Sequence, residues 1–170
     1  LVKTRNKTMS FKKIIFFFLL IIPLFTFSQC IAGDCENGNG EYKFTNGLYT
    51  GEFINGEPHG DGVFRNKRGY VYNGAWLNGI KEGVGTESFK KGFFYEGYFL
   101  ENQRHGNGLA IFKDNRFMQN IQYSGEWLNG SMCGKGELRY DREVKYGRVK
   151  EIETNILIGM FLNGVYQGRM

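Results

Sequence analysis

A short motif of aromatic residues and glycine recurs along the chain and constrains its fold more than any other feature. The motif places Tyr, Gly and Trp or Phe at alternate positions, ends in Asn-Gly or Asn, and is followed four residues later by Gly-x-Gly. The alternating residues of the four complete copies are Tyr49, Gly51 and Phe53; Tyr72, Gly74 and Trp76; Tyr95, Gly97 and Phe99; and Tyr123, Gly125 and Trp127. Such self-similarity predicts a repeat architecture in which each unit packs on its neighbours.

The spacing within the motif is that of a β-strand. Residues at i, i+2 and i+4 lie on one face of a strand, so the two rings and the glycine share a face. We expect the glycine to leave room for a ring of the next repeat, and Asn-Gly to adopt the positive φ of a tight turn. One hairpin is marginal in water, whereas several stacked hairpins bury a continuous aromatic core. The sequence therefore predicts an all-β, elongated single-sheet array of stacked antiparallel β-hairpins, with almost no helix after residue 30.

The motif resembles the MORN (membrane occupation and recognition nexus) repeat, which reads approximately Tyr-x-Gly-x-Trp/Phe-x-Asn-Gly and then Gly-x-Gly. The resemblance covers a repeat domain at residues 35–170. It comprises a half repeat at 35–48, repeats starting near 49, 72, 95 and 123, and a degenerate one near 157. Residues 139–156 are an insertion that we expect to lengthen the strands. The resemblance implies a scaffold or adaptor rather than an enzyme, with membrane association a recurrent theme.

Residues 1–29 have a different composition from the repeats. A basic start at Met9–Lys13 precedes the apolar stretch Ile14–Phe27, and small residues follow before Gln29. This is the layout of a secretory signal, so we predict an N-terminal extension and an apolar signal helix that is cleaved before Gln29. The protein is then exported to the periplasm, the outer membrane surface or the exterior. Retention as a membrane anchor and lipidation of Cys30 are the alternatives.

The three cysteines cannot all pair with one another. Cys30 and Cys35 are close enough in sequence to form a disulfide in an oxidising compartment, unless Cys30 is lipidated. Cys133 lies several repeats further along, beyond disulfide reach, and is expected to be a free thiol at a turn.

The positive charge of the chain lies in two places. The formal net charge is +5, but residues 1–29 hold five basic and no acidic residues, so the remainder is neutral and no nucleic-acid partner is expected. Within the repeats, acids dominate before Gly-x-Gly and bases dominate after it. The bases form a predicted basic binding edge: Arg65, Lys67, Arg68, Lys90, Lys91, Lys113 and Arg116. Such an edge can meet anionic lipid or an acidic protein surface, or it can simply keep the edge solvated.

The chemistry-bearing residues do not converge. His59 and His105 occupy the same repeat position two repeats apart, and Glu52, Glu96 and Glu126 are expected to face solvent. We predict no catalytic residue, metal site, cofactor or small-molecule substrate. The resulting hypothesis is a non-enzymatic exported scaffold of the cell envelope that binds protein or membrane. The alternative is an extracellular structural or glycan-contacting protein with exposed aromatic faces, and an enzyme is the third.

Overall fold

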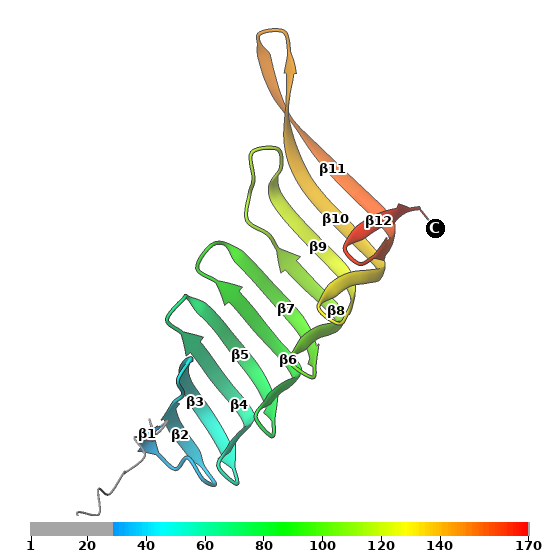
Figure 1. The fold of residues 1–170 in the computed structure, drawn as a ribbon. Coiled ribbons are helices and arrows are strands. Elements are labelled where there is room, and N and C mark those ends of the chain that lie inside the picture. The colour runs from blue at the N-terminus through cyan, green and yellow to red at the C-terminus, as the bar shows by residue number, and fades with distance from the viewer. Residues whose placement is uncertain (1–28, 170) are drawn as a thin grey trace, which may run out of the picture.

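The computed structural model describes residues 29–169, which form one open sheet of twelve antiparallel strands (Figure 1). Each strand pairs with the next in sequence, so the sheet order is the chain order. The strands are β1 (Gln29–Gly33), β2 (Asn39–Lys43), β3 (Gly47–Ile54), β4 (Glu57–Asn66), β5 (Tyr70–Leu77), β6 (Ile80–Phe89), β7 (Phe93–Leu100), β8 (Gln103–Ile111), β9 (Gln119–Leu128), β10 (Ser131–Tyr146), β11 (Val149–Leu162) and β12 (Val165–Gly168). The predicted all-β single-sheet array is confirmed.

The described residues contain no helix, and hence no helix able to cross a membrane. The predicted signal helix lies within residues 1–29, almost all of which fall outside the described part of the chain.

Tight turns with positive φ close one long edge of the sheet, as predicted. Asn55 and Gly56 join β3 to β4 with φ of 52° and 76°. The same pair of positions has positive φ at every later turn on this edge, including Glu101 and Asn102, where no glycine is present. Two successive residues at positive φ match the right-handed twist of the flanking strands. The other turns, between β4 and β5, β6 and β7, and β8 and β9, lie along the opposite edge (Figure 1).

The core is a row of rings on one face of the sheet. Tyr49, Tyr72, Tyr95 and Tyr123 are completely buried, although residues 29–169 form no second layer over them. Each tyrosine meets two rings edge-on: the ring four residues later and the corresponding ring of the next repeat, at centroid distances of 4.9–5.4 Å. The predicted contact between rings of successive copies is therefore present. Edge-to-face geometry is favourable for aromatic pairs beyond the area they bury.

The ring that packs on the paired glycines is a different one from the ring that the sequence predicted. Gly97 and Gly108 face each other across β7 and β8, and the ring of Tyr95 from the same hairpin lies over both. A Cβ on Gly108 would overlap this ring, so the expectation that a ring of the next repeat covers the glycine is wrong. The ring of Tyr95 stays over its own hairpin because a bulge lies next to the glycine pair. The register shifts between Gly97 and Tyr98 on β7, and Gly106 on β8 takes φ of 59° there. The Tyr95 hydroxyl donates a 3.1 Å hydrogen bond to the carbonyl of Tyr98 at this bulge, which holds the ring over its own hairpin.

Two insertions lengthen the edge opposite the Asn-Gly turns. Residues 112–118 form a longer connection between β8 and β9, and residues 139–156 extend β10 and β11. The long β10–β11 hairpin projects beyond the rest of the sheet (Figure 1).

We expect Gly108→Ala to lower the free energy of unfolding by about 2–3 kcal/mol, because the new methyl group collides with the Tyr95 ring. Gly106→Ala is the control: its Cβ would find its nearest neighbour at 3.7 Å. That variant should therefore lose only about 1 kcal/mol, from the strain of a positive φ. Urea unfolding of both variants measures the difference. In a Tyr95→Leu background the excess cost of Gly108→Ala should disappear, and equal costs in both backgrounds would contradict the ring-on-glycine account.

Candidate functional site

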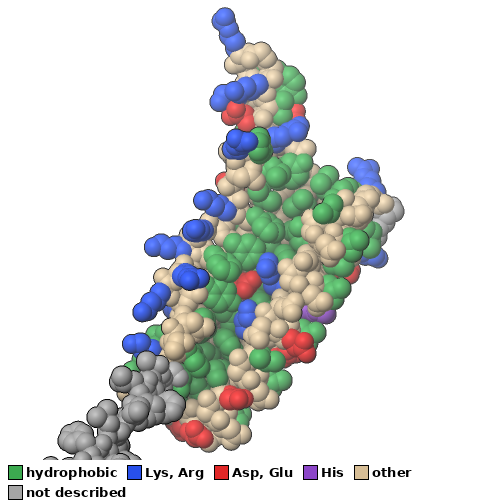
Figure 2. Space-filling model, viewed as in Figure 1, with side chains coloured by type: hydrophobic (Ala, Val, Ile, Leu, Met, Phe, Trp, Pro, Cys, Tyr) green, Lys and Arg blue, Asp and Glu red, His purple; other side chains and the backbone are tan. Residues whose placement is uncertain are grey.

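The predicted basic residues lie along one edge of the sheet. Arg65, Lys67 and Arg68 surround the β4–β5 turn, and Lys90 and Lys91 lie in the β6–β7 turn. Lys113 and Arg116 belong to the β8–β9 connection, and all seven side chains are exposed. Figure 2 shows the Lys and Arg side chains following this edge of the array. The structure thus brings residues from three repeats into one row, which we call the basic edge.

Acidic residues gather at the opposite edge, beside the Asn-Gly turns. Glu57 and Glu82 follow two of these turns, and Glu101 forms part of a third. The sheet therefore separates charge across its width, because each repeat carries its acids and bases at opposite ends of its hairpin. Stacking the hairpins in register turns this bias within one repeat into two rows along the array.

The cations of the basic edge have no acidic partner among the described residues. None of the seven takes part in an ion pair shorter than 4.0 Å within residues 29–169. By contrast, Lys150 and Arg142 in the long hairpin are paired with Glu143 and Glu153. The row of unpaired cations leaves a positive potential along the edge that an anionic surface can neutralise.

Exposed aromatic side chains accompany these cations. Phe89 is 45% exposed beside Lys90, and Phe117 is 63% exposed beside Arg116. The Arg116 guanidinium lies 4.4 Å from the centroid of the Phe117 ring. Cations next to partly exposed rings are the combination found where proteins meet the head-group region of a membrane.

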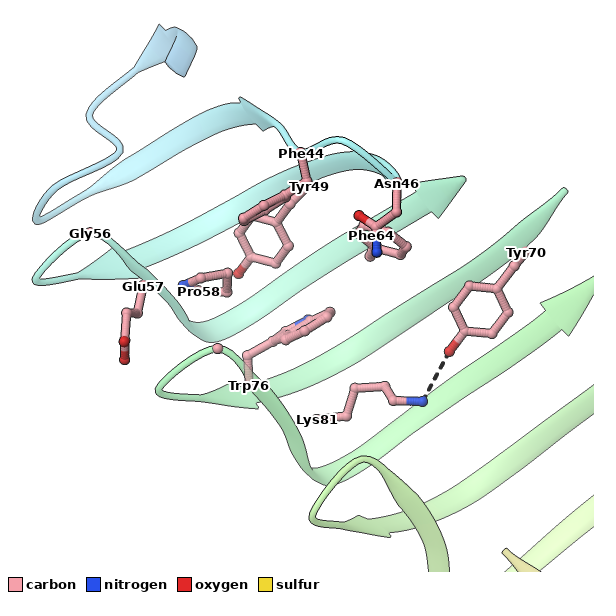
Figure 3. A pocket seen from close by; sticks show the side chains of 11 residues that line it. Phe44, Asn46, Tyr49, Gly56, Glu57, Pro58, Phe64, Tyr70, Trp76 and Lys81 are labelled. Carbon is pink, nitrogen blue, oxygen red and sulfur yellow. Dashed lines mark hydrogen bonds between the residues drawn. The ribbon is translucent and has the colours of Figure 1, made fainter. Parts of the chain in front are cut away.

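The aromatic face carries a shallow hollow between the first hairpins. Rings of Tyr49, Phe64, Tyr70 and Trp76 surround a space of about 480 Å³, and the side chain of Lys81 closes one end (Figure 3). Its walls are mostly apolar. The indole Nε1 of Trp76 donates to the backbone carbonyl of Gly62, which fixes the indole at the wall of the hollow.

A charged cluster lies next to this hollow in the centre of the aromatic face. Glu87 is only 6% exposed, and its carboxylate oxygens lie 3.1 Å from Arg104 Nε and 3.6 Å from Lys81 Nζ. The Tyr70 hydroxyl donates a 3.1 Å hydrogen bond to Glu87, and Lys81 Nζ donates to the Tyr70 oxygen at 3.0 Å. These four side chains therefore supply one another with hydrogen-bond and ion-pair partners.

The two cations of the cluster also lie over rings of the core. Lys81 Nζ is 4.9 Å from the Phe99 centroid, and the Arg104 guanidinium is 5.0 Å from that of Trp127. Burial lowers the pKa of Lys81, and the neighbouring Glu87 opposes this shift. Burial, followed by the charge of Glu87, raises the pKa of Tyr70 well above its ordinary value. Burial likewise raises the pKa of Tyr95 and of Tyr123 to about 12.

Sequence reasoning missed this cluster, although the repeat alignment contains a signal for it. Lys81 and Arg104 stand where the other repeats have Pro58 and Met132, two residues after the turn. Glu87 stands two residues after Gly-x-Gly, where the neighbouring repeats have apolar or aromatic side chains. Charged residues at positions that face the core in other repeats indicate that these side chains must pair with one another. The cluster is an internally paired network that joins β6 to β8 across the core.

The remaining candidate residues stay apart. His59 lies on β4 and His105 on β8, as their repeat positions required. Among residues 29–169, no group of three His, Cys, Asp or Glu side chains is placed to hold a metal ion. Cys133 is a free, half-buried thiol, as expected, but it lies on β10, three residues after Gly130, and not in the turn itself. Cys30 on β1 forms a disulfide with Cys35.

Comparison with known families identifies the repeats. The family model for the MORN repeat matches residues 36–48, 49–69, 72–93, 95–115 and 123–141, which together make up more than half of the chain. The matched segments stop before the degenerate copy near residue 157, although Asn163 and Gly164 there form the same kind of turn. No curated protein matches the chain.

We expect Glu87→Gln to lower the free energy of unfolding by about 2–3 kcal/mol. The substitution leaves Lys81 and Arg104 near each other without a counter-charge. Because both cations are partly exposed, the loss of stability is smaller than for a fully buried unpaired ion. Glu96→Gln, an exposed acid on the other face of β7, should change stability by less than about 0.5 kcal/mol. Chemical denaturation compares the two variants. Equal losses would show that the network does not stabilise the fold.

Proposed function

The chain belongs to the MORN repeat family, and from this we propose that it is a non-enzymatic interaction scaffold whose basic edge lies against an anionic membrane surface. MORN repeats bind membranes or proteins, and the family is generally non-enzymatic. The membrane as the specific partner, and this edge as the contact, are our proposal.

The observation that carries the proposal is the row of unpaired cations with exposed rings beside them. Each Lys or Arg held near an anionic lipid surface contributes about 1 kcal/mol of attraction, so several in one row give measurable binding. Phe89 and Phe117 can enter the head-group region beside these cations. The extended, rigid sheet holds the contacts of three repeats in one line, which a single hairpin cannot do.

An acidic protein surface offers related chemistry at the same edge, but it lacks an apolar layer for the two phenylalanine rings. We therefore favour the membrane. The alternative of a glycan-contacting protein with exposed aromatic faces has less support, because the largest rings of the aromatic face are buried against one another.

We further propose that the protein is exported and acts in the cell envelope. The signal-like pattern of residues 1–29 supports export, and so does the Cys30–Cys35 disulfide, since disulfides persist in oxidising compartments. The disulfide also argues against lipidation of Cys30, because a sulfur joined to a lipid by a thioether cannot at the same time bond to Cys35.

Binding to vesicles tests the membrane proposal. The purified protein should sediment with vesicles that contain phosphatidylserine and remain free of phosphatidylcholine vesicles, with less binding at high salt. Lys90→Glu combined with Lys91→Glu should weaken the partition roughly tenfold or more, since two attractive charges become repulsive. Lys135→Glu combined with Arg169→Glu makes the same net charge change at exposed sites away from the basic edge, and it should leave most of the binding intact.

Two outcomes would contradict the membrane proposal. Equal binding to both kinds of vesicle would remove the role of charge, and equal loss in the two double variants would remove the role of this edge. If no vesicle binds, the remaining candidate for the edge is an acidic protein surface.

Mass spectrometry of the protein isolated from the producing cell tests export. We expect the mature chain to begin at Gln29, with a mass lower by two hydrogens than that of the fully reduced chain because of the Cys30–Cys35 bond. A chain that retains residues before Gln29 would indicate an anchor. A lipid-sized mass increase on Cys30 would indicate lipidation.

A further inference from the structure

Among residues 29–169, no strand pairs with the outer edge of β11 over most of its length. On its inner side, β11 pairs with β10 without a register shift from Tyr146↔Val149 to Gly134↔Phe161. On its outer side, within the described part of the chain, β12 covers only Met160–Leu162. The stretch from Val149 to Ile158 is therefore an open sheet edge (Figure 1).

The register identifies the backbone groups that this edge presents. The β10–β11 hairpin closes with a two-residue turn, so Tyr146 and Val149 form a hydrogen-bonded pair and such pairs recur at every second residue. The even-numbered residues of β11 consequently direct their N–H and C=O groups outward. These residues are Lys150, Ile152, Thr154 and Ile156, followed by Ile158, whose carbonyl already accepts a 3.1 Å hydrogen bond from the Tyr166 hydroxyl.

The two ends of the sheet differ in how well they are protected against pairing. β1, at the opposite end, has five residues, a register irregularity between Cys30 and Ala32, and a disulfide. Short edges and bulges are the usual devices that block edge-to-edge association. β11 has fourteen residues, no proline and no bulge in its pairing with β10.

An apolar row follows the open edge. Ile152, Ile156 and Ile158 are 58%, 44% and 56% exposed on the face opposite the aromatic core. Four of the nearby charged side chains are paired within the hairpin, Arg142 with Glu153 and Lys150 with Glu143, whereas Glu151 takes part in no ion pair within residues 29–169. A long edge with an apolar row and no bulge favours strand addition.

The end of the long hairpin also lacks support from the rest of the sheet. The pairing of β10 with β9 ends at Asp141↔Gln119, so residues 142–153 form a two-stranded ribbon beyond it. A two-stranded ribbon alone is marginal in water, and a third strand would stabilise it. The opposite side of the ribbon, Arg142–Tyr146 of β10, is only five residues long, so it is the weaker template.

We propose that β11 pairs antiparallel with β11 of a second copy of this chain, about a twofold axis at Thr154. This register places Ile152 beside Ile156 of the second copy and Glu153 beside Asn155 of the second copy, with no like charges opposed. The three central residue pairs can exchange about six hydrogen bonds through the outward groups. An axis at position 153 would oppose two copies of Glu153. An axis at position 155 would pair Ile152 with Ile158 of the second copy, whose carbonyl already accepts a hydrogen bond from the Tyr166 hydroxyl.

The mass of the purified protein in solution tests the pairing. Sedimentation equilibrium over a range of concentrations should show a reversible monomer–dimer equilibrium. Ile156→Lys should weaken dimerisation more than tenfold, because two new cations would lie next to the partner's apolar row. Leu128→Lys is the matched control: Leu128 is 48% exposed on the same face of β9, and its replacement should leave the equilibrium unchanged. Circular dichroism confirms that both variants fold.

A cysteine at the axis tests the register. In a Cys133→Ser background, Thr154→Cys should give a disulfide-linked dimer on mild oxidation, because the two copies of residue 154 face each other within bonding distance. Leu128→Cys in that background should not crosslink. A wild-type protein that stays monomeric, a dimer that survives Ile156→Lys, or equal weakening by both lysine variants would overturn the proposal. Assemblies that grow beyond the dimer would point instead to head-to-tail pairing of β1 with β11.

Discussion

The packing of a tyrosine ring on two facing glycines is the contact on which the rest of this structure depends. A one-layer sheet has no second layer to bury its side chains, so each ring must be buried by its neighbours within the same face. Gly97 and Gly108 remove two side chains at one point, and the ring of Tyr95 can then lie flat enough for the rings of Phe99 and Trp127 to meet it edge-on. Repeating this contact along the chain produces a row of buried rings on one face of a sheet that consists of a single layer.

The same contact fixes the position of the functional edge. Because the four complete repeats use the same glycine pair, successive hairpins align with their Asn-Gly or Asn turns on one side and their other turns on the other. Side chains at the turns make little contact with the core, so they can carry charge without loss of packing. Acids collect at one edge and unpaired bases at the other, and the row of rings keeps the hairpins that carry these bases side by side. In this molecule, the repeat that supplies stability also creates the charged surface.

The sequence was sufficient to predict the strands and the turns, because both depend on local spacing. It was not sufficient to predict which ring covers the glycines. That choice depends on the bulge at Gly106, and a glycine that takes positive φ looks the same in sequence as one that lies beneath a ring. The network of Lys81, Glu87 and Arg104 was missed for a related reason. Its members lie on two strands, and only the cross-strand register shows that three isolated charges meet.

An open sheet must end at both sides, and the two ends of this one are built differently. β1 is short, irregular and held by a disulfide, whereas β11 is long and regular, and its first residues pair with β10 in a hairpin end that no other described strand supports. Addition at only one end favours a closed twofold pair over a filament, since a filament needs both ends to be available. Antiparallel pairing within one sheet would keep the two aromatic faces on the same side and direct the two basic edges in opposite directions. Self-association and membrane contact therefore use different edges of the sheet, and neither needs the residues of the other.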